Sequence, residues 1–335
     1  MVDESSGFSL WVDFVERSFI ENEFIEMIEK QIIDGATSNP SIFANAIMSS
    51  SAYKEDLKEL AGKSAKEKYE ALAIKDIRLA AVALRECYDS ALEGYVSIEV
   101  DPYLSNDTQG TIEEGIRLFQ EIGEPNVMIK VPATEAGYEA MRELMSRGIS
   151  VNATLVFSPE QALKALEAMK KGIHKFNEFD EGRVEGVISI FVSRFDRMLD
   201  ATLQELGVEK SKTGIYNAAK IYNLLMQDFH PAIKPLFAST GVKEGQDLPK
   251  DYYITSLCAK HSINTAPIET IQAYEANPNK GKLALPIDES EIEAYFNRLK
   301  ELNIDMNKVY EELMKEGLEA FEQSFAKLLE MLERV

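Results

Sequence analysis

Short apolar runs alternate with longer amphipathic segments along most of this chain. A run of about four to eight apolar residues bounded by turn residues is typical of a strand buried on both faces. Strands that alternate with helices predict a parallel sheet, and eight of them predict an α/β fold closed into a (β/α)8 barrel of the TIM type. The predicted strands are residues 10–15, 35–39, 95–100, 127–131, 151–157, 187–192, 235–239 and 252–257, of which 35–39 has the weakest composition.

Two of the intervening helices have specific start signals. Thr111 and Glu114 form a capping-box pattern at the start of residues 111–122. In residues 158–161 (SPEQ), the serine would cap a helix, the proline would occupy its first position and the glutamine its third. Apolar stripes follow in both segments, carried by Ile112, Ile116, Phe119 and Ile122 in the first and by Ala162, Leu163, Leu166 and Met169 in the second.

The segments outside the regular alternation predict additional helices. Residues 16–30 and 41–84 have helical patterns, residues 277–290 are rich in loop residues, and residues 304–335 form a long amphipathic helix. Its apolar stripe consists of Val309, Leu313, Phe321, Phe325, Leu328 and Leu332. We see no internal repeat and no linker, so the sequence predicts one domain, residues 1–335, with these helices added to the barrel.

Composition narrows the function classes. The chain has 335 residues, 57 of them acidic and 36 basic, for a net charge of −21. This balance argues against a nucleic-acid-binding protein, which would present a basic patch. No apolar run approaches the ~18 residues needed to span a bilayer, and the acidic start of the chain does not resemble a secretory signal. Two distant cysteines and three scattered histidines show no metal-ligand spacing, so we expect a cytoplasmic protein with reduced thiols.

Lys130 interrupts an otherwise apolar strand, residues 127–131. An isolated lysine at a strand end usually extends its ammonium to water along an apolar stem. A buried lysine would instead have to be paired, neutral or put to use, and a desolvated amine is the nucleophile that Schiff-base chemistry with a ketone requires. The residues around Lys130 in the barrel decide between these alternatives.

Polar residues also occur near the carboxyl ends of six further predicted strands. Active sites of (β/α)8 barrels lie at that end, where the loops after the strands gather. One such residue is usually a hydrogen-bonded core residue, but seven strands that each contribute one predict a functional site. The set comprises Asp13, Thr37, Ser38, Asn39, Glu99, Asp101, Lys130, Asn152, Thr154, Ser189, Arg194, Ser239 and Lys243.

The chemistry of this set is coherent. Lys130 provides a covalent handle, and the carboxylates Asp13 and Glu99 could divide acid and base work if their environments differ. Asparagine offers both donor and acceptor groups to the hydroxyls of a polyol. Arg194, with Ser239 and Lys243 nearby, predicts an anion site. A local cationic pocket of this kind could bind a phosphate despite the acidic exterior.

Six segments resemble those of transaldolases, in the same order. They are ATSNPS at residues 36–41, VSIEVDP at 96–102, IKVPAT at 129–134, VNATLVFS at 151–158, SIFVSR at 189–194 and ASTGVK at 238–243. The resemblance extends from about residue 10 to about residue 267. It implies a Schiff-base enzyme of the pentose phosphate pathway, which transfers a dihydroxyacetone unit between sugar phosphates and needs neither a metal nor an organic cofactor.

The resemblance also implies a role for each matching residue. Lys130 would form the imine with the substrate ketone, Asp13 would take the proton from the C4 hydroxyl, and Glu99 would move protons through a water held by Thr154. The three-carbon fragment would be held by Asn39, Asn152 and Ser189. The phosphate would be bound by Arg194 and Ser239. Two departures stand out: the cation of ASTGVK, Lys243, is spaced differently from the Ser-x-Arg of other members, and Tyr103 stands where arginine is expected and is given no role.

Several alternatives remain at this point. A fructose 6-phosphate aldolase would share the fold and the lysine but release free dihydroxyacetone. Members of that kind are much shorter and carry glutamine and tyrosine at the positions of Glu99 and Phe191, so both residues favour transfer. A catalytically dead barrel would lack at least one of Lys130, Asp13 and Glu99, but all three are present. A chain of 335 residues leaves no room for a fused isomerase domain. The sequence is compatible with a monomer or a homodimer.

Overall fold

The computed structural model describes residues 7–90, 93–243 and 245–334. Residues 1–6, which carried the expectation about a secretory signal, and residue 335, at the end of the predicted final helix, lie outside these ranges. Among the described helices, none is both long enough and apolar enough to cross a membrane.

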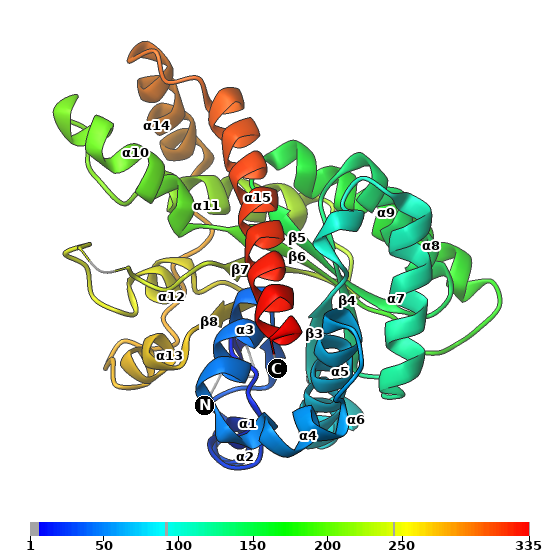
Figure 1. Cartoon of the computed structure of the whole chain (residues 1–335). Coiled ribbons are helices and arrows are strands. Elements are labelled where there is room, and N and C mark those ends of the chain that lie inside the picture. The colour runs from blue at the N-terminus through cyan, green and yellow to red at the C-terminus, as the bar shows by residue number, and fades with distance from the viewer. Residues whose placement is uncertain (1–6, 91–92, 244, 335) are drawn as a thin grey trace.

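Eight parallel strands close into a barrel in chain order, with β1 paired to both β2 and β8 (Figure 1). This confirms the predicted (β/α)8 fold. The helices between the strands cover the outer face of the barrel and return the chain to the end where the next parallel strand begins. The strands are β1 (Phe8–Val12), β2 (Gly35–Thr37), β3 (Tyr95–Glu99), β4 (Val127–Pro132), β5 (Ser150–Val156), β6 (Gly186–Phe191), β7 (Ile233–Ala238) and β8 (Ser262–Ala266).

The prediction of the eighth strand was wrong. Residues 252–257 form the helix α12 (Tyr252–Leu257), and the strand is β8, some ten residues later. Aromatic and β-branched residues made Tyr252–Leu257 resemble a strand, but strand propensity depends on packing context. The side chains of Ser262 and Asn264 make β8 polar, although the whole strand is buried. Several of its polar groups bond within the fold: Thr240 donates to Asn264 Oδ1 at 2.8 Å and Ser262 Oγ donates to Ala259 O at 2.8 Å.

The helices surround the barrel in the expected alternation. Before β3 they are α1 (Arg17–Ile20), α2 (Glu23–Glu29), α3 (Pro40–Ser49), η1 (Ser51–Tyr53), α4 (Lys54–Glu59), α5 (Ala65–Ala83) and α6 (Arg85–Asp89). After it come η2 (Pro102–Leu104), α7 (Thr108–Ile122), α8 (Glu135–Ser146), α9 (Pro159–Asn177), α10 (Ser193–Glu205), α11 (Thr213–Gln227), α12, α13 (Ile268–Glu275), α14 (Glu289–Glu301) and α15 (Met306–Glu333). The predicted helical segments 16–30 and 41–84 are therefore divided into shorter helices.

One of the two predicted helix starts is confirmed. Ser158 caps α9, and Gln161 returns the bond in a complete capping box. The box predicted for Thr111 and Glu114 is wrong because α7 begins three residues earlier, with Asp107 as its cap. Glu114 instead accepts a hydrogen bond from the backbone nitrogen of Asp101 at 2.6 Å, which ties α7 to the loop after β3.

The helix α15 crosses the carboxyl end of the barrel (Figure 1). It contacts α3 and α5 near its own end and the β5 and α10 region earlier in its length. All six residues of its predicted apolar stripe are buried. The final helix therefore packs over the barrel opening rather than against one side only.

Below the opening, large side chains fill the barrel interior. Trp11, Tyr95, Met128, Leu236 and Ile263 belong to one buried cluster contributed by five strands. A β-carbon at Gly35 would lie 2.4 Å from the Trp11 ring, so glycine leaves the space that the indole occupies. This apolar layer separates the polar side chains at the carboxyl ends of the strands from a second, largely buried polar group at their amino ends, which includes Ser9, Asp34 and the Lys234–Glu93 pair.

The buried stripe of α15 gives a direct test of how this helix is held. We expect Leu328→Ala to lower the free energy of unfolding by about 2–5 kcal/mol, because Leu328 is fully buried and its truncation leaves a cavity. The neighbouring exposed residue provides the control, and Lys327→Ala should change stability by less than about 0.5 kcal/mol. Urea denaturation measures both, and equal effects would contradict this packing.

Candidate functional site

Strand register places three predicted site residues side by side. Glu99 on β3 is opposite Lys130 on β4, and Lys130 is opposite Asn152 on β5. Because alternate residues of a barrel strand point inward, three residues in one register row face the interior together. The hydrogen bonds of Asn152 confirm this orientation, since it bonds to side chains of β3 and β6 across the barrel.

Lys130 is buried, with 5% of its surface exposed. Its Nζ donates a hydrogen bond to the carbonyl oxygen of Ser38 at 3.1 Å and lies 3.9 Å from Glu99 Oε2. The Phe321 ring of α15 covers the ammonium, with its centroid 5.9 Å from Nζ. The lysine therefore does not extend to water, and the surface alternative for it is excluded.

Glu99 is 4% exposed, and neither of its carboxylate oxygens has a hydrogen-bond partner among the described residues. Burial raises the pKa of Glu99 to about 7; the Lys130 ammonium opposes this shift and the Asp13 carboxylate adds to it. A carboxyl group with a pKa near 7 can both donate and accept a proton close to neutral pH. The raised pKa, the nearby ammonium and the absence of hydrogen bonds among the described residues make Glu99 a candidate functional carboxylate.

Asp13 directly follows β1 at the same end of the barrel. Its Oδ1 accepts a hydrogen bond from Thr37 Oγ1 at 2.7 Å, and Thr37 Oγ1 lies 2.7 Å from Thr265 Oγ1. Its backbone nitrogen donates to Ala266 O at 2.8 Å. The carboxylate is therefore oriented by β2 and β8. Sequence reasoning missed Thr265 because the eighth strand was placed on the wrong segment.

The amide of Asn152 is held on both sides. Its Nδ2 donates to Ser97 Oγ at 3.0 Å, and its Oδ1 accepts from Ser189 Oγ at 2.6 Å. Thr154, two residues further along β5, has a buried hydroxyl oxygen with no partner among the described residues. Asn39 is half-buried and uses its Oδ1 to cap α3, accepting from Ile42 N at 3.1 Å.

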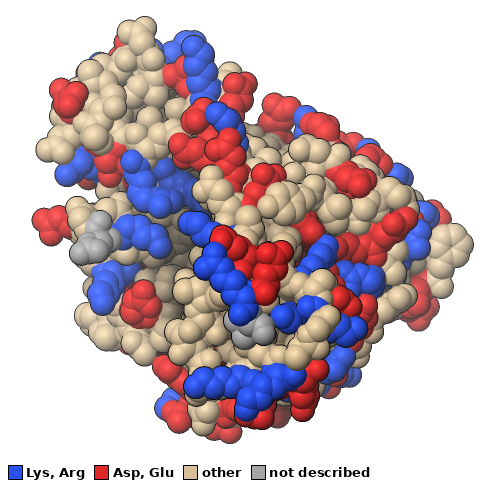
Figure 2. Space-filling view, viewed as in Figure 1, with Lys and Arg blue, Asp and Glu red and all other residues tan. Residues whose placement is uncertain are grey.

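A cationic group lies where α10 begins. The Arg194 guanidinium lies 5.4 Å from the Phe191 ring, and Phe191 packs on Phe157 with ring centroids 5.3 Å apart. Burial, and next the like charge of Arg197, lowers the pKa of Arg194. Figure 2 shows Lys and Arg side chains gathered over α10, beside a hollow next to α15.

Ser239 completes this part of the site. It follows β7 in the left-handed region (φ 56°), and its Oγ lies 3.0 Å from Ser193 Oγ at the start of α10. The hydroxyl is thus placed next to the first turn that carries Arg194. A left-handed serine is uncommon and marks a locally constrained turn.

Lys243 and Tyr103, whose roles the sequence did not decide, are both exposed. Lys243 is exposed in the loop after β7. Gly241, between it and Ser239, is buried, and a β-carbon there would lie 3.0 Å from Pro267 Cγ. A side chain at this position would require the start of α13 to shift. Tyr103 is 55% exposed and packs edge-on against Phe325 of α15, with centroids 6.0 Å apart.

The helix α15 contributes residues that the sequence did not assign to the site. Phe321 covers Lys130, and Gly317 packs at the Arg194 guanidinium, since a β-carbon at Gly317 would lie 3.4 Å from Nη1 and 3.0 Å from Leu155 Cδ2. The amphipathic stripe predicted that Phe321 is buried, but not that it is buried against the lysine. The contact between Phe321 and Lys130 depends on how α15 crosses the barrel.

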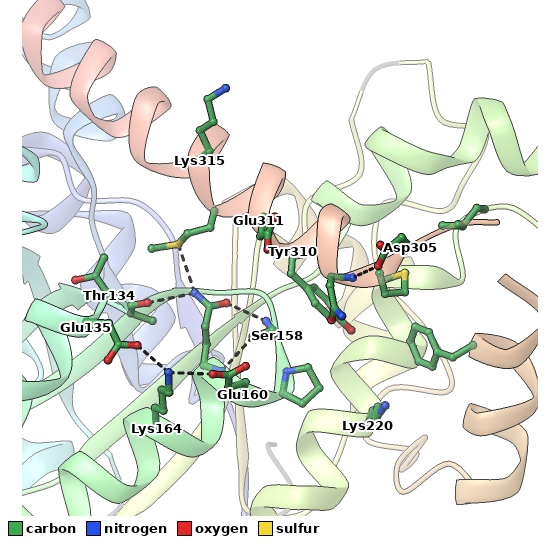
Figure 3. Close-up of a pocket in the computed structure, with 18 of the residues that line it drawn as sticks. Thr134, Glu135, Ser158, Glu160, Lys164, Lys220, Asp305, Tyr310, Glu311 and Lys315 are labelled. Atoms are coloured by element: carbon green, nitrogen blue, oxygen red, sulfur yellow. Dashed lines mark hydrogen bonds and ion pairs between the residues drawn. The ribbon is translucent and has the colours of Figure 1, made fainter. Parts of the chain in front are cut away.

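A second opening lies on the other side of α15. This groove of about 1520 Å³ is lined by residues of α8, α9, α11, α14 and the first half of α15, including Lys164, Lys220 and Tyr310 (Figure 3). Gln161 separates it from the barrel rim by bonding to Ala133 O at 3.2 Å and Leu155 O at 3.3 Å. None of the predicted site residues lines this groove. Within the described part of the chain, no group of three or more His, Cys, Asp and Glu is placed to hold a metal ion.

Comparison with known proteins identifies the family. A family model described as transaldolase/fructose-6-phosphate aldolase matches residues 10–332. The chain belongs to this family. A transaldolase of Helicobacter pylori (strain Shi470) is 47% identical over 323 aligned residues, which cover 96% of this chain and 98% of the relative. A transaldolase of Campylobacter jejuni subsp. doylei (strain ATCC BAA-1458 / RM4099 / 269.97) is 44% identical over 335, covering 97% and 99%. The expected resemblance and the prediction of an enzyme of the transaldolase kind are confirmed.

The raised pKa of Glu99 predicts a pH-dependent contribution to stability. The folded state binds this proton more tightly than the unfolded chain, so the contribution is complete below pH 4.5 and is lost as the pH rises through about 7. The difference corresponds to roughly 3 kcal/mol at most. We expect Glu99→Gln, which cannot ionise, to become more stable relative to the wild type between pH 5 and pH 8, measured by urea denaturation.

The control for this measurement is an exposed glutamate on α15. Glu319→Gln should run parallel to the wild type over the same pH range, because Glu319 is solvated in the folded protein. A constant difference between Glu99→Gln and the wild type would show that Glu99 has an ordinary pKa in the folded state.

Proposed function

We propose that the chain is a transaldolase that transfers a dihydroxyacetone unit through an imine on Lys130. The observation that carries this proposal is the buried Lys130, bonded to Ser38 O and 3.9 Å from a carboxyl group whose pKa is raised to about 7. The match to the transaldolase/fructose-6-phosphate aldolase family model and the transaldolases among the relatives support it.

In the first step, the Lys130 ammonium passes a proton to the Glu99 carboxylate, 3.9 Å away, and the free amine attacks the C2 ketone of a ketose phosphate such as fructose 6-phosphate or sedoheptulose 7-phosphate. Imine formation requires a proton for the leaving hydroxide, which departs as water. Glu99 would supply and recover this proton, and a pKa of about 7 supports transfer in both directions. We infer that a water relays it, since Glu99 and Thr154 both present buried oxygens that no described protein group satisfies.

The second step breaks the C3–C4 bond. Asp13 takes the proton of the C4 hydroxyl, the aldose phosphate leaves, and the bonding electrons pass to the protonated imine and give an enamine. Thr37 and Thr265 hold the Asp13 carboxylate in one orientation for this transfer. The amide of Asn152, fixed by Ser97 and Ser189, is in a position to hold the hydroxyls of the three-carbon fragment together with Asn39.

The third step adds the enamine to an acceptor aldehyde, erythrose 4-phosphate or glyceraldehyde 3-phosphate. Transfer requires that the enamine is not protonated by solvent before the acceptor arrives. Phe321 covers Lys130, and Phe191 presents an aromatic ring without a hydroxyl. Both features favour transfer over the release of free dihydroxyacetone. Arg194 and Ser239 would bind the phosphate, with Lys243 as a further predicted ligand. These substrates belong to the pentose phosphate pathway.

Imine trapping tests the role of Lys130. Borohydride with fructose 6-phosphate should reduce the imine to a stable adduct on Lys130, located by mass spectrometry, and Lys130→Met should form none. Asp13→Ala should still give the adduct but turn over more slowly by about two to four orders of magnitude, because general-base assistance is lost. An unmodified Lys130 in the wild type would refute the mechanism.

Product analysis tests transfer against simple cleavage. With fructose 6-phosphate and erythrose 4-phosphate, we expect sedoheptulose 7-phosphate and glyceraldehyde 3-phosphate in equal amounts. Without the acceptor, we expect no more than one equivalent of glyceraldehyde 3-phosphate per enzyme, because the three carbons stay on Lys130. Steady release of dihydroxyacetone would identify a fructose 6-phosphate aldolase instead.

A further inference from the structure

Arg194 and Arg197 differ from the other arginines of this protein. Among the described residues, every other arginine forms an ion pair or donates a hydrogen bond. Arg194 packs on the Phe191 ring without either, and Arg197 is exposed without either. In a chain with 57 acidic and 36 basic residues, partners for arginine are abundant. Two neighbouring arginines that both lack them at the barrel opening require an explanation.

The two residues share one face of α10. They are three positions apart in a helix, which brings side chains within about 60° of each other around the axis. Their charges are close enough that Arg197 acts to lower the pKa of Arg194. Like charges at this spacing destabilise a helix. An anion between the two guanidinium groups would turn that repulsion into attraction.

The surroundings favour an external anion over a protein carboxylate. Of the carboxylates, Glu316 on α15 has the largest effect on the pKa of Arg194, but it is exposed and forms no ion pair with either arginine among the described residues. Arg194 cannot move freely, because Phe191 lies on one side and Gly317 on another. The inner arginine is therefore fixed at the substrate end, and the outer one lies one turn further toward solvent.

We propose that Arg197 is a second phosphate-binding residue, which clamps the substrate phosphate against Arg194 and makes the site selective for phosphomonoesters over neutral sugars. A phosphomonoester carries about −2 near neutral pH, so two guanidinium groups balance it, and each can donate two parallel hydrogen bonds to its oxygens. Arg197 is a specificity residue here, remote from Lys130. The proposal rests on the proposed function and deepens it.

Steady-state kinetics with Arg197→Ala tests this assignment. We expect the KM for fructose 6-phosphate to rise roughly tenfold or more, the effect of losing one charge-assisted hydrogen bond, with kcat little changed. Arg197→Lys keeps the charge but loses the planar fork, so its KM should lie between those of Arg197→Ala and the wild type. Thermal stabilisation by inorganic phosphate, which needs no turnover, should weaken in parallel.

Two comparisons separate this role from the alternatives. Arg298→Ala, which removes an exposed arginine of α14 paired with Glu301 at 3.3 Å, should leave KM and phosphate stabilisation unchanged. Lys243→Ala should have a smaller effect than Arg197→Ala. If Lys243→Ala raises KM and Arg197→Ala does not, Lys243 is the second cation and the proposal is wrong.

Dihydroxyacetone, which has the ketone but no phosphate, distinguishes failure of this inference from failure of the proposed function. Borohydride trapping of dihydroxyacetone on Lys130 should proceed equally in the wild type and in Arg197→Ala. An equal loss with dihydroxyacetone and fructose 6-phosphate would overturn the role of Arg197. Absence of any trapped adduct in the wild type would instead overturn the imine mechanism.

Discussion

The ion pair between Lys130 and Glu99 is the interaction on which the site depends. Both groups are almost completely buried, yet their separation is 3.9 Å and neither carboxylate oxygen is hydrogen-bonded among the described residues. A buried pair with such incomplete satisfaction contributes little to stability and is costly to keep. The closed barrel makes it tolerable, because strands on either side fix Glu99 and Lys130 in one register row. The rigid barrel thus keeps the Lys130 ammonium and the Glu99 carboxylate close together. In solvent, water would separate the two groups and screen their charges.

The predicted site residues on the strands lie between two apolar boundaries. Below them, Trp11 and the side chains around it fill the barrel. Above them, Phe321 and Gly317 of α15 close over Lys130 and Arg194. Between the two apolar boundaries, a charge interacts strongly because little water screens it. This region is where the pKa of Glu99 is raised, whereas glutamates on the outer helices remain in contact with solvent.

The parts of the structure that sequence could predict are those with a local signal. Lys130 and Glu99 are polar residues inside apolar strands, and Ser158 begins a helix with its full cap, so each was recognisable from its neighbours. Thr265 was not, because β8 is itself polar and bonds to residues outside its own segment, such as Thr240. Phe321 was predicted to be buried, but its contact with the ammonium depends on how α15 crosses the barrel. The path of α15 over the barrel depends on packing between segments that are far apart in the sequence. A local sequence pattern does not predict such packing.

Arg197 is the clearest case of information that only the assembled structure provides. In the sequence it is one arginine of a surface helix, and nothing distinguishes it from Arg298. Among the described residues, Arg197 has no ion pair or hydrogen bond and lies three positions from Arg194 on α10, whereas Arg298 pairs with Glu301. An acidic protein that binds anions must keep its carboxylates away from the few cations that bind them. We therefore expect unpaired arginines to locate the anion site of such a protein better than the density of positive charge does, because paired cations raise that density without attracting a ligand.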